Sequence, residues 1–255
     1  MLRTATQKNN VPFPCGETLF PQAADSGTDG RAQTKSKERV RQHGEVFTAE
    51  REVKAMCDLV KDETERIDSR FLEPACGDGN FLAEILSRKL AVVKRKYGRS
   101  HLDYEKNAVL AASSIYGVDI LLDNVIACRA RMFALWDKEY KAVCKKDCNE
   151  QTREAVKFIL SRNIVCGNAL TLKCVDENAN DTDEPIIFSE WTFPFNDAQM
   201  QRKDYSFAEL LHTAEYNEKN KEEGQHSLFA NENGEDEATL LKQYISHYRR
   251  IWQDE

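Results

Sequence analysis

The chain has 255 residues, of which 41% are hydrophobic and 31% are charged, with a formal net charge of −7. This length suits one large α/β domain or two small ones. No apolar run approaches the ~18–20 residues of a membrane span. The N-terminal stretch MLRTATQKNNVPF lacks the apolar segment of a secretory signal, and the eight cysteines show no disulfide spacing. We therefore expect a cytoplasmic protein with reduced thiols and no membrane partner.

The charge is divided unevenly along the chain. Residues 1–175 hold 29 Lys/Arg against 24 Asp/Glu, whereas residues 176–255 hold 7 against 19, so the two parts carry +5 and −12. A polyanion would be tolerated by the first part and repelled by the second. Ordinary solvated surfaces explain both values equally well.

The first 180 residues predict helices and strands in alternation. Residues 1–35 are rich in Pro, Gly and polar residues, which predicts a flexible lead-in. A helix is expected at 48–62, where Thr48 is a candidate N-cap. The elements that follow are strand 70–73, helix 79–97, helix 104–113, strand 114–120, helix 122–140 and strand 164–167. This order predicts an α/β fold with parallel strands and crossover helices.

The C-terminal part is less regular. Residues 185–191 (PIIFSEW) are apolar enough for a strand, and residues 215–238 are expected to form an acidic, polar loop. A terminal helix is predicted from the apolar spacing of Leu240, Leu241, Tyr244, Ile245, Tyr248 and Ile251. The expected organisation is a lead-in at 1–35, a ligand-binding domain at 36–214, the loop at 215–238 and the helix at 239–255.

A glycine loop follows the first predicted strand, in FLEPACGDGNFL at 71–82. In a strand–loop–helix unit, Gly77 and Gly79 let the backbone approach a ligand, and the helix N–H groups point at it. A dinucleotide site would need a third small residue at position 82 and an acid about 20 positions further on. Position 82 is Leu, and the next strand-end acid is Asp119. A ligand without a pyrophosphate is therefore indicated.

S-adenosylmethionine fits these residues, since it is a nucleoside with a zwitterionic amino-acid tail. Asp119, at the end of the second strand, is placed to accept from ribose hydroxyls. Asn168, after the third strand, is placed to meet the adenine edge, with apolar neighbours at 169–170. Glu73 could balance the cationic amino group. The other interpretation, a glycine turn in an ordinary α/β fold, is weakened because the three positions follow in the required order.

Four motifs resemble those of adenine-N6 DNA methyltransferases of the restriction-modification type. They are HGEVFT (43–48), LEPACGDGNFL (72–82), YGVDI (116–120) and CGNAL (166–170). The resemblance covers roughly residues 35–210 and is closest to members in which the cofactor half precedes the catalytic half. It implies a Rossmann-like class I methyltransferase sheet with flanking helices, and S-adenosylmethionine as cofactor.

The resemblance also implies roles for single residues. Phe47 and Thr48 would lie beside the methionyl end of the cofactor. The loop around the methionine moiety would consist of Glu73, Ala75, Cys76, Gly77 and Gly79. Asp119 and Ile120 would hold the ribose and flank the adenine, and Asn168 would meet the adenine edge. One departure is Ala49, where family members commonly have Pro.

The catalytic loop of that family, Asn/Asp-Pro-Pro-Tyr/Phe, does not occur in this sequence. The six prolines stand at positions 12, 14, 21, 74, 185 and 194, so no two are adjacent. The nearest sequence, TFPFND at 192–197, is better explained as a β-turn. FSEW at 188–191 resembles an insert that precedes the loop in the family. We therefore expect no catalytic residue in this chain and a sheet that is incomplete at its C-terminal side.

Three functional hypotheses remain open. The first is the S-adenosylmethionine-binding part of a site-specific adenine-N6 DNA methyltransferase, as a truncated or split gene product or a fragment. It would meet DNA through a missing or separate downstream part, with a complementing C-terminal polypeptide or a restriction subunit as partner. The second is a degenerate methyltransferase that binds cofactor as a regulatory module, and the third is an enzyme for a non-DNA substrate. A zinc site is not expected, because Cys144, Cys148, Cys166 and Cys174 match no compact ligand spacing.

Overall fold

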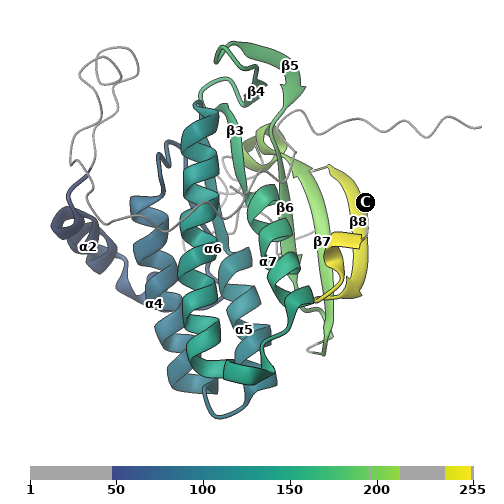
Figure 1. Ribbon diagram of the computed structural model, residues 1–255. Coiled ribbons are helices and arrows are strands. Elements are labelled where there is room, and N and C mark those ends of the chain that lie inside the picture. Colours follow the sequence, from purple (N-terminus) through teal and green to yellow (C-terminus); the bar gives the residue numbers. More distant parts are fainter. Residues whose placement is uncertain (1–47, 196, 213–238, 254–255) are drawn as a thin grey trace, which may run out of the picture.

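The computed structural model describes residues 48–195, 197–212 and 239–253 (Figure 1). The predicted lead-in at 1–35 and the predicted loop at 215–238 lie outside the described residues. Within the described ranges, no helix is long and apolar enough to cross a membrane.

A five-stranded mixed sheet forms the centre of the molecule. Its strands lie in sequence order: β1 Phe71–Glu73, β2 Ile115–Asp119, β3 Ile164–Asn168, β4 Lys173–Val175 and β5 Asp181–Pro185. The first three are parallel, and β4 and β5 return antiparallel. The predicted α/β class and the three predicted parallel strands are confirmed. Because parallel strands end at one edge, β1, β2 and β3 present their carboxyl ends together.

Two helices precede β1, namely α2 Glu50–Leu59 and α3 Lys61–Thr64. Each connection between the parallel strands contains two more: α4 Asn80–Tyr97 and α5 His101–Ser113 between β1 and β2, and α6 Leu122–Cys144 and α7 Glu150–Asn163 between β2 and β3, with a short 3₁₀ turn, η1, at Lys145–Asp147. Helices α4 and α6 run away from the carboxyl edge, and α5 and α7 run back toward it (Figure 1). Helix α7 is absent from the elements predicted above; its N-cap Asn149 accepts from the Gln151 N–H at 2.8 Å. The predicted cap of the first helix, Thr48, is wrong, because the cap is Ala49 without a side-chain bond.

The two faces of the sheet are covered differently. Ile115 and Ile164 belong to the large core formed with the helices. The neighbouring side chains Tyr116 and Val118 point to the other face, into a second core with Phe188 of the strand β6. The Tyr116 ring meets Phe188 edge-on at 5.5 Å, and its hydroxyl donates to the Ser189 carbonyl oxygen at 2.8 Å. Because side chains alternate along β2, this strand packs into the cores on both faces of the sheet.

A second, three-stranded antiparallel sheet follows the first. It consists of β6 Ile187–Thr192, β7 Gln199–Ser206 and β8 Leu240–His247, and a 3₁₀ turn, η2, follows at Ile251–Gln253. The strand predicted at 185–191 is confirmed as β6. Residues 193–198 connect β6 to β7 as an antiparallel hairpin, in agreement with the β-turn interpretation of TFPFND; Asn196 lies outside the described residues.

The predicted terminal helix is wrong, because residues 240–247 form a strand. Helical packing would have buried one apolar stripe, yet Leu241 and Ile245 are 49% and 47% exposed. The register instead runs from Gln199 opposite His247 to Tyr205 opposite Leu240, so β8 satisfies the outer backbone groups of β7. Those hydrogen bonds outweigh the local helical pattern.

The buried ammonium of Lys89, on α4, fixes the segment that enters β1. Lys89 Nζ donates to the carbonyl oxygens of Arg66 and Ile67, both at 3.1 Å, and to that of Ser69. It also contacts Ser114 Oγ, immediately before β2, at 2.8 Å. The starts of β1 and β2 are therefore tied to the helix that begins at the glycine loop.

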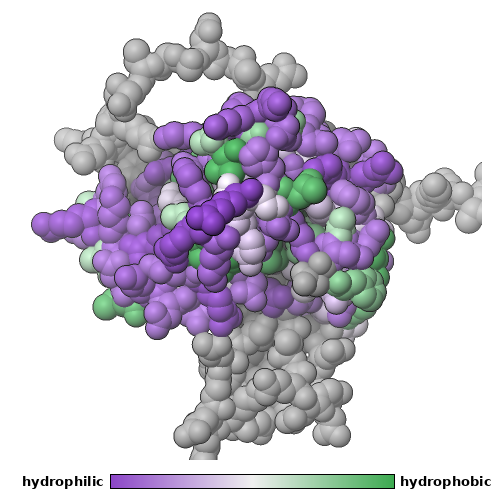
Figure 2. All heavy atoms as spheres, turned by 90° about the horizontal axis from the view of Figure 1, so that it is seen from below, coloured by the Kyte–Doolittle hydropathy of each residue, from purple (hydrophilic) through white to green (hydrophobic). Residues whose placement is uncertain are grey.

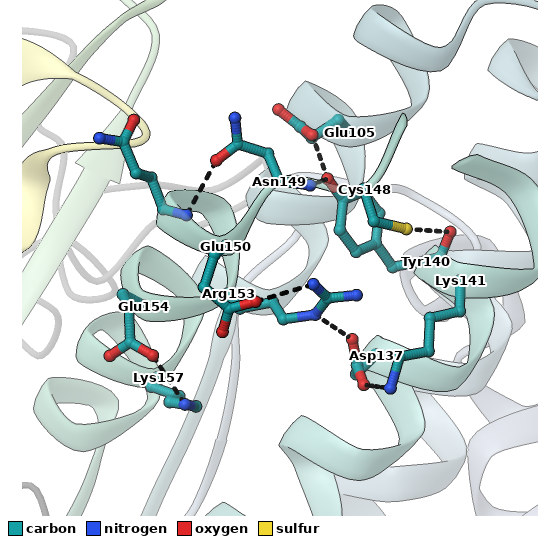
Figure 3. A network of polar contacts seen from close by, with 11 residues as sticks. Glu105, Asp137, Tyr140, Lys141, Cys148, Asn149, Glu150, Arg153, Glu154 and Lys157 are labelled. Atoms are coloured by element: carbon teal, nitrogen blue, oxygen red, sulfur yellow. Dashed lines mark hydrogen bonds and ion pairs between the residues drawn. The ribbon is translucent and has the colours of Figure 1, made fainter. Parts of the chain in front are cut away.

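A polar network locks the helices together beneath the sheet (Figure 3). Arg153 of α7 donates to Asp137 of α6 at 2.7 Å and to Glu150 at 2.9 Å. The Tyr140 hydroxyl donates to Glu105 of α5 and accepts from the Asn149 N–H at 2.8 Å. These bonds hold α5, α6 and α7 in one register.

The buried carboxylate of Glu105 also anchors the second sheet. Its Oε1 accepts from the Tyr248 hydroxyl at 2.5 Å and from Arg249 Nε at 2.7 Å, directly after β8. With Tyr140, three donors from two distant parts of the chain therefore converge on one acidic group.

We predict that Glu105→Gln lowers the free energy of unfolding by about 1–3 kcal/mol, because a buried amide group then faces a hydroxyl donor and the charge opposite Arg249 is lost. Urea unfolding of the full chain measures this. The control is Glu139→Gln on α6, whose pair with Lys94 at 3.3 Å is largely solvated. It should change stability by less than about 0.5 kcal/mol. Equal effects of the two variants would contradict the anchoring role of Glu105.

Candidate functional site

The glycine loop lies between β1 and α4, at the carboxyl edge of the sheet. The Cys76 N–H donates to the Val118 carbonyl oxygen at 2.9 Å, and the Gly79 N–H donates to the Cys76 carbonyl oxygen at 2.8 Å. Gly77 and Gly79 have φ angles of 53° and 87°, a region that favours glycine. The turn therefore depends on both glycines, as predicted from their spacing.

The two glycines have different surroundings. A Cβ on Gly79 would lie 2.7 Å from Cys128 Sγ and 3.0 Å from Met132 Cε, so Gly79 allows α4 and α6 to pack closely. A Cβ on Gly77 would meet nothing within 4 Å. The loop therefore packs tightly on its inner side and is open at Gly77, where a ligand can approach the backbone.

Asp119, at the end of β2, joins the loop to the next strand. Its Oδ2 accepts from the Gly77 N–H at 2.8 Å. Its Oδ1 accepts from the Leu121 N–H at 2.9 Å and from Asn124 Nδ2 at 3.1 Å. A carboxylate has about four acceptor positions. The side chain, 9% exposed, therefore keeps an acceptor position beyond the three bonds and is oriented before any ligand arrives.

Asn168, at the end of β3, is also held in place. Its Oδ1 accepts from the Leu170 N–H at 3.0 Å, and its Nδ2 donates to Asp181 of β5 at 3.0 Å. Leu170 beside it is 94% exposed. The hairpin of β4 and β5 thus orients the amide, and an apolar side chain stands free next to it.

Glu73, the last residue of β1, is a half-buried carboxyl group. Burial raises its pKa, and a hydrogen bond from the Ala75 backbone N–H partly offsets this effect. Because burial destabilises the anionic form, a cation placed beside Glu73 would be bound favourably. The role of Glu73 as partner of an amino group stays a prediction.

Three of the remaining predicted residues have different surroundings. Cys76 is buried, and a hydrogen bond with Cys128 together with burial raises the pKa of its thiol, so it packs the loop as a neutral group. Ile120 is half-buried, and its carbonyl oxygen accepts from Cys166 Sγ at 3.7 Å. Thr48 precedes α2, and no hydrogen bond of the described chain joins it to the loop. Phe47 lies outside the described residues.

One stripe of α6 supports the site, and the sequence analysis did not identify it. Asn124, Cys128 and Arg131 follow at i, i+4 and i+7 and face Asp119, Gly79 and the loop in turn. Arg131 Nη1 contacts Asn80 Oδ1 at 2.6 Å and Asp78 Oδ1 at 3.3 Å. The helical spacing of these residues is a local pattern, but the partners of Arg131 lie 51 and 53 positions away in sequence.

In the part of the chain that the structure covers, no group of three His, Cys, Asp or Glu side chains could hold a metal ion. The thiols Cys144 and Cys148 instead donate to the carbonyl oxygens of His101 and Tyr140, each at 3.8 Å.

Comparison with known proteins gives one match. The family model described as "MmeI, DNA-methyltransferase domain" matches residues 48–223. No curated protein and no solved structure matches the chain. The matched range contains the glycine loop, Asp119 and Asn168.

We predict that Arg131→Met loosens the glycine loop, because Asp78 and Asn80 lose a shared cationic partner. Amide hydrogen exchange at residues 76–80 should become faster by more than the change in global stability explains, because the lost contacts are local to the loop. The matched control is Lys138→Met, an exposed position of the same helix. Exchange that is unchanged in Arg131→Met, or equally fast in both variants, would argue against the clamp.

Proposed function

The chain belongs to the family of the MmeI DNA-methyltransferase domain, and from this premise we propose that it is the S-adenosylmethionine-binding part of an adenine-N6 DNA methyltransferase of the restriction-modification type. The observation that carries the proposal is the 2.8 Å bond between the Gly77 N–H and Asp119. This bond joins the glycine loop to the strand-end acid in one preorganised site.

The residues at the carboxyl edge fit the proposed cofactor. The open side of Gly77 offers backbone to the methionine moiety, and Asp119 has acceptor capacity for ribose hydroxyls. Glu73 would balance the amino group, and Asn168 with Leu170 would meet the adenine edge and face. The remaining predicted cofactor residues are Phe47, Thr48, Ala75, Cys76, Gly79 and Ile120. When bound, S-adenosylmethionine supplies an electrophilic methyl group.

This chain's residues bind and orient, but none of them is proposed to act on a base. Methyl transfer to an exocyclic amine requires acceptors that orient the nitrogen and an aromatic ring that stacks the flipped base. In the family these come from an Asn/Asp-Pro-Pro-Tyr/Phe loop, and no two prolines of this sequence are adjacent. We therefore propose that DNA and the catalytic loop reach the cofactor from a part of the enzyme outside these 255 residues.

The edge of β1 that no described strand covers is the proposed place for that part. Among the described strands, β1 has one neighbour, β2. The Phe71 N–H bonds toward β2, to the Ser114 carbonyl oxygen at 3.0 Å, so the backbone groups of Leu72 face the other edge. Leu72 itself packs against the second core, which contains Phe188 and Phe207. An added strand could pair with β1 through the backbone groups of this edge.

A second candidate is a degenerate methyltransferase that keeps cofactor binding as a regulatory module. The missing Pro-Pro sequence favours it as much as the split enzyme. Complementation separates the two, because only the split enzyme regains methyl transfer when a catalytic part is added. For either candidate we propose a cytoplasmic location; the seven described cysteines are free thiols.

The cofactor proposal predicts that the chain binds S-adenosylmethionine and that Asp119→Ala weakens binding by about 1.5–3 kcal/mol, roughly ten- to over a hundredfold, because a charge-assisted hydrogen bond is lost. Isothermal titration calorimetry measures the affinity, and circular dichroism checks the fold. Asp183→Ala, an exposed position of β5, is the matched control and should bind like the wild type. Equal affinity of Asp119→Ala and wild type would remove Asp119 from the site. A wild-type chain that binds no cofactor would refute the proposal.

The proposed division of labour predicts that the 255-residue chain does not methylate DNA alone. Incubation with tritiated S-adenosylmethionine and mixed-sequence DNA should leave the DNA unlabelled, because no group orients the target nitrogen. A polypeptide with Asn-Pro-Pro-Tyr and a recognition domain should restore labelling, and Gly77→Arg should abolish it again. Labelling by the chain alone that Gly77→Arg removes would contradict the prediction.

A further inference from the structure

A hollow lined by cations lies at the end of the molecule opposite the glycine loop. Its volume is about 600 Å³, and no acidic side chain lines it. It lies where α4 and α6 end, and we call it the basic hollow. Its charged or ionisable lining residues are Lys94, Arg95, Lys96, Arg99, His101 and Lys145. Seen from this end, the surface is dominated by hydrophilic side chains (Figure 2).

Part of this charge is compensated within the chain. Three of the lining residues have an acidic neighbour: Lys94 with Glu139 at 3.3 Å, Arg95 with Glu65 at 3.9 Å and His101 with Asp147 at 2.7 Å. Three exposed lining cations, Lys96, Arg99 and Lys145, form no ion pair with the described residues. The same holds for the exposed Lys146, which follows Lys145 in sequence but does not line the hollow. The chain has a net charge of −7. These four cations without an acidic partner therefore make the surface at this end positively charged, opposite in sign to the chain as a whole.

Helix termini explain only some of these positions. Lys94, Arg95 and Lys96 occupy the last turn of α4, where cations interact favourably with the helix dipole. Arg99 lies beyond that helix, and Lys145 and Lys146 follow the end of α6. Interaction with a helix dipole therefore does not account for all the cations at the basic hollow.

The backbone at Lys145 points to a role for its side chain. Lys145 has φ 51° and ψ −116°, a conformation that glycine adopts easily and that is strained for residues with a Cβ. Here the position carries a lysine, which places a charge at the rim of the hollow despite the strain.

We propose that the basic hollow binds the phosphate backbone of DNA. Phosphates are bound by Lys and Arg without apolar anchors, whereas a protein partner would need an apolar or aromatic centre, and the uncharged lining residues are Gly98, Ala142 and Val143. The choice of DNA rests on family membership and not on cofactor binding. Helix α4 has 18 residues, so the hollow lies about 27 Å from the glycine loop. It contacts DNA away from the target base, independently of sequence.

The test measures binding of a fluorescein-labelled mixed-sequence duplex to the full chain by anisotropy, as NaCl is raised from about 50 to about 200 mM. In the double variant Lys96→Ala/Arg99→Ala, binding should weaken, and the slope of log K against log salt should become shallower by about 1.8, or 0.9 per lost phosphate contact. The matched control, Lys203→Ala/Lys242→Ala on β7 and β8, should keep the wild-type slope. Equal slopes for both double variants would overturn the proposal.

A second variant separates charge from structure. Lys145→Gly removes the charge and relieves the backbone, so DNA binding should weaken while the midpoint of thermal unfolding stays constant or rises. Unchanged DNA binding in Lys145→Gly would contradict the proposal that the basic hollow binds DNA. Binding of polyglutamate at the basic hollow with loss of bound DNA would also contradict it. Calorimetry with S-adenosylmethionine should give wild-type affinity for these variants. Absent cofactor binding with intact DNA binding would refute the proposed function and leave the basic hollow standing.

Discussion

The arrangement of the candidate site depends on one buried carboxylate. Asp119 stands at the end of β2 and accepts bonds from the glycine loop, from the backbone after β2 and from α6. A buried carboxylate is stable only where donors replace its water. The donors here come from three separate segments, so the need to solvate Asp119 also sets their relative positions. The free acceptor capacity of the same group is then available to a ligand at no further cost of orientation.

Helix α6 positions the rest of the candidate site through contacts with Asp119 and the glycine loop. Asn124, Cys128 and Arg131 lie on one stripe and touch the strand-end acid, the inner glycine and the outer loop in turn. Gly79 is necessary because a side chain there would collide with this stripe. The inner side of the loop is therefore packed against α6, and only its outer surface at Gly77 is open. Such a site needs little rearrangement when a ligand binds, which favours affinity.

The same helix connects two ends of opposite chemistry. Its N-terminal end supports the carboxyl edge, where acids and backbone N–H groups are suited to a zwitterionic nucleoside. Its C-terminal end carries Lys145 at the basic hollow. A duplex held at the basic hollow would lie far from the site of methyl transfer, so the two proposed sites serve different parts of the substrate. The acidic balance of residues 176–255 would repel DNA elsewhere and leave the basic end as the attractive surface.

The sequence by itself determined the order of the strands and helices around the glycine loop, and the positions of Gly77, Asp119 and Asn168 at strand ends. These are local properties: a glycine turn, buried apolar runs and the rule that parallel strands end at one edge. The helix α7 had a local signal as well, with apolar Ala155, Val156 and Ile159 at helical spacing, but it was not assigned. Only the tertiary structure decided that residues 240–247 form a strand, because the backbone groups of β7 form their hydrogen bonds there. It alone also decided that Arg131 clamps the loop and that Glu105 meets Tyr248, since those partners are separated by 51 to 143 residues and no local pattern encodes such distant contacts.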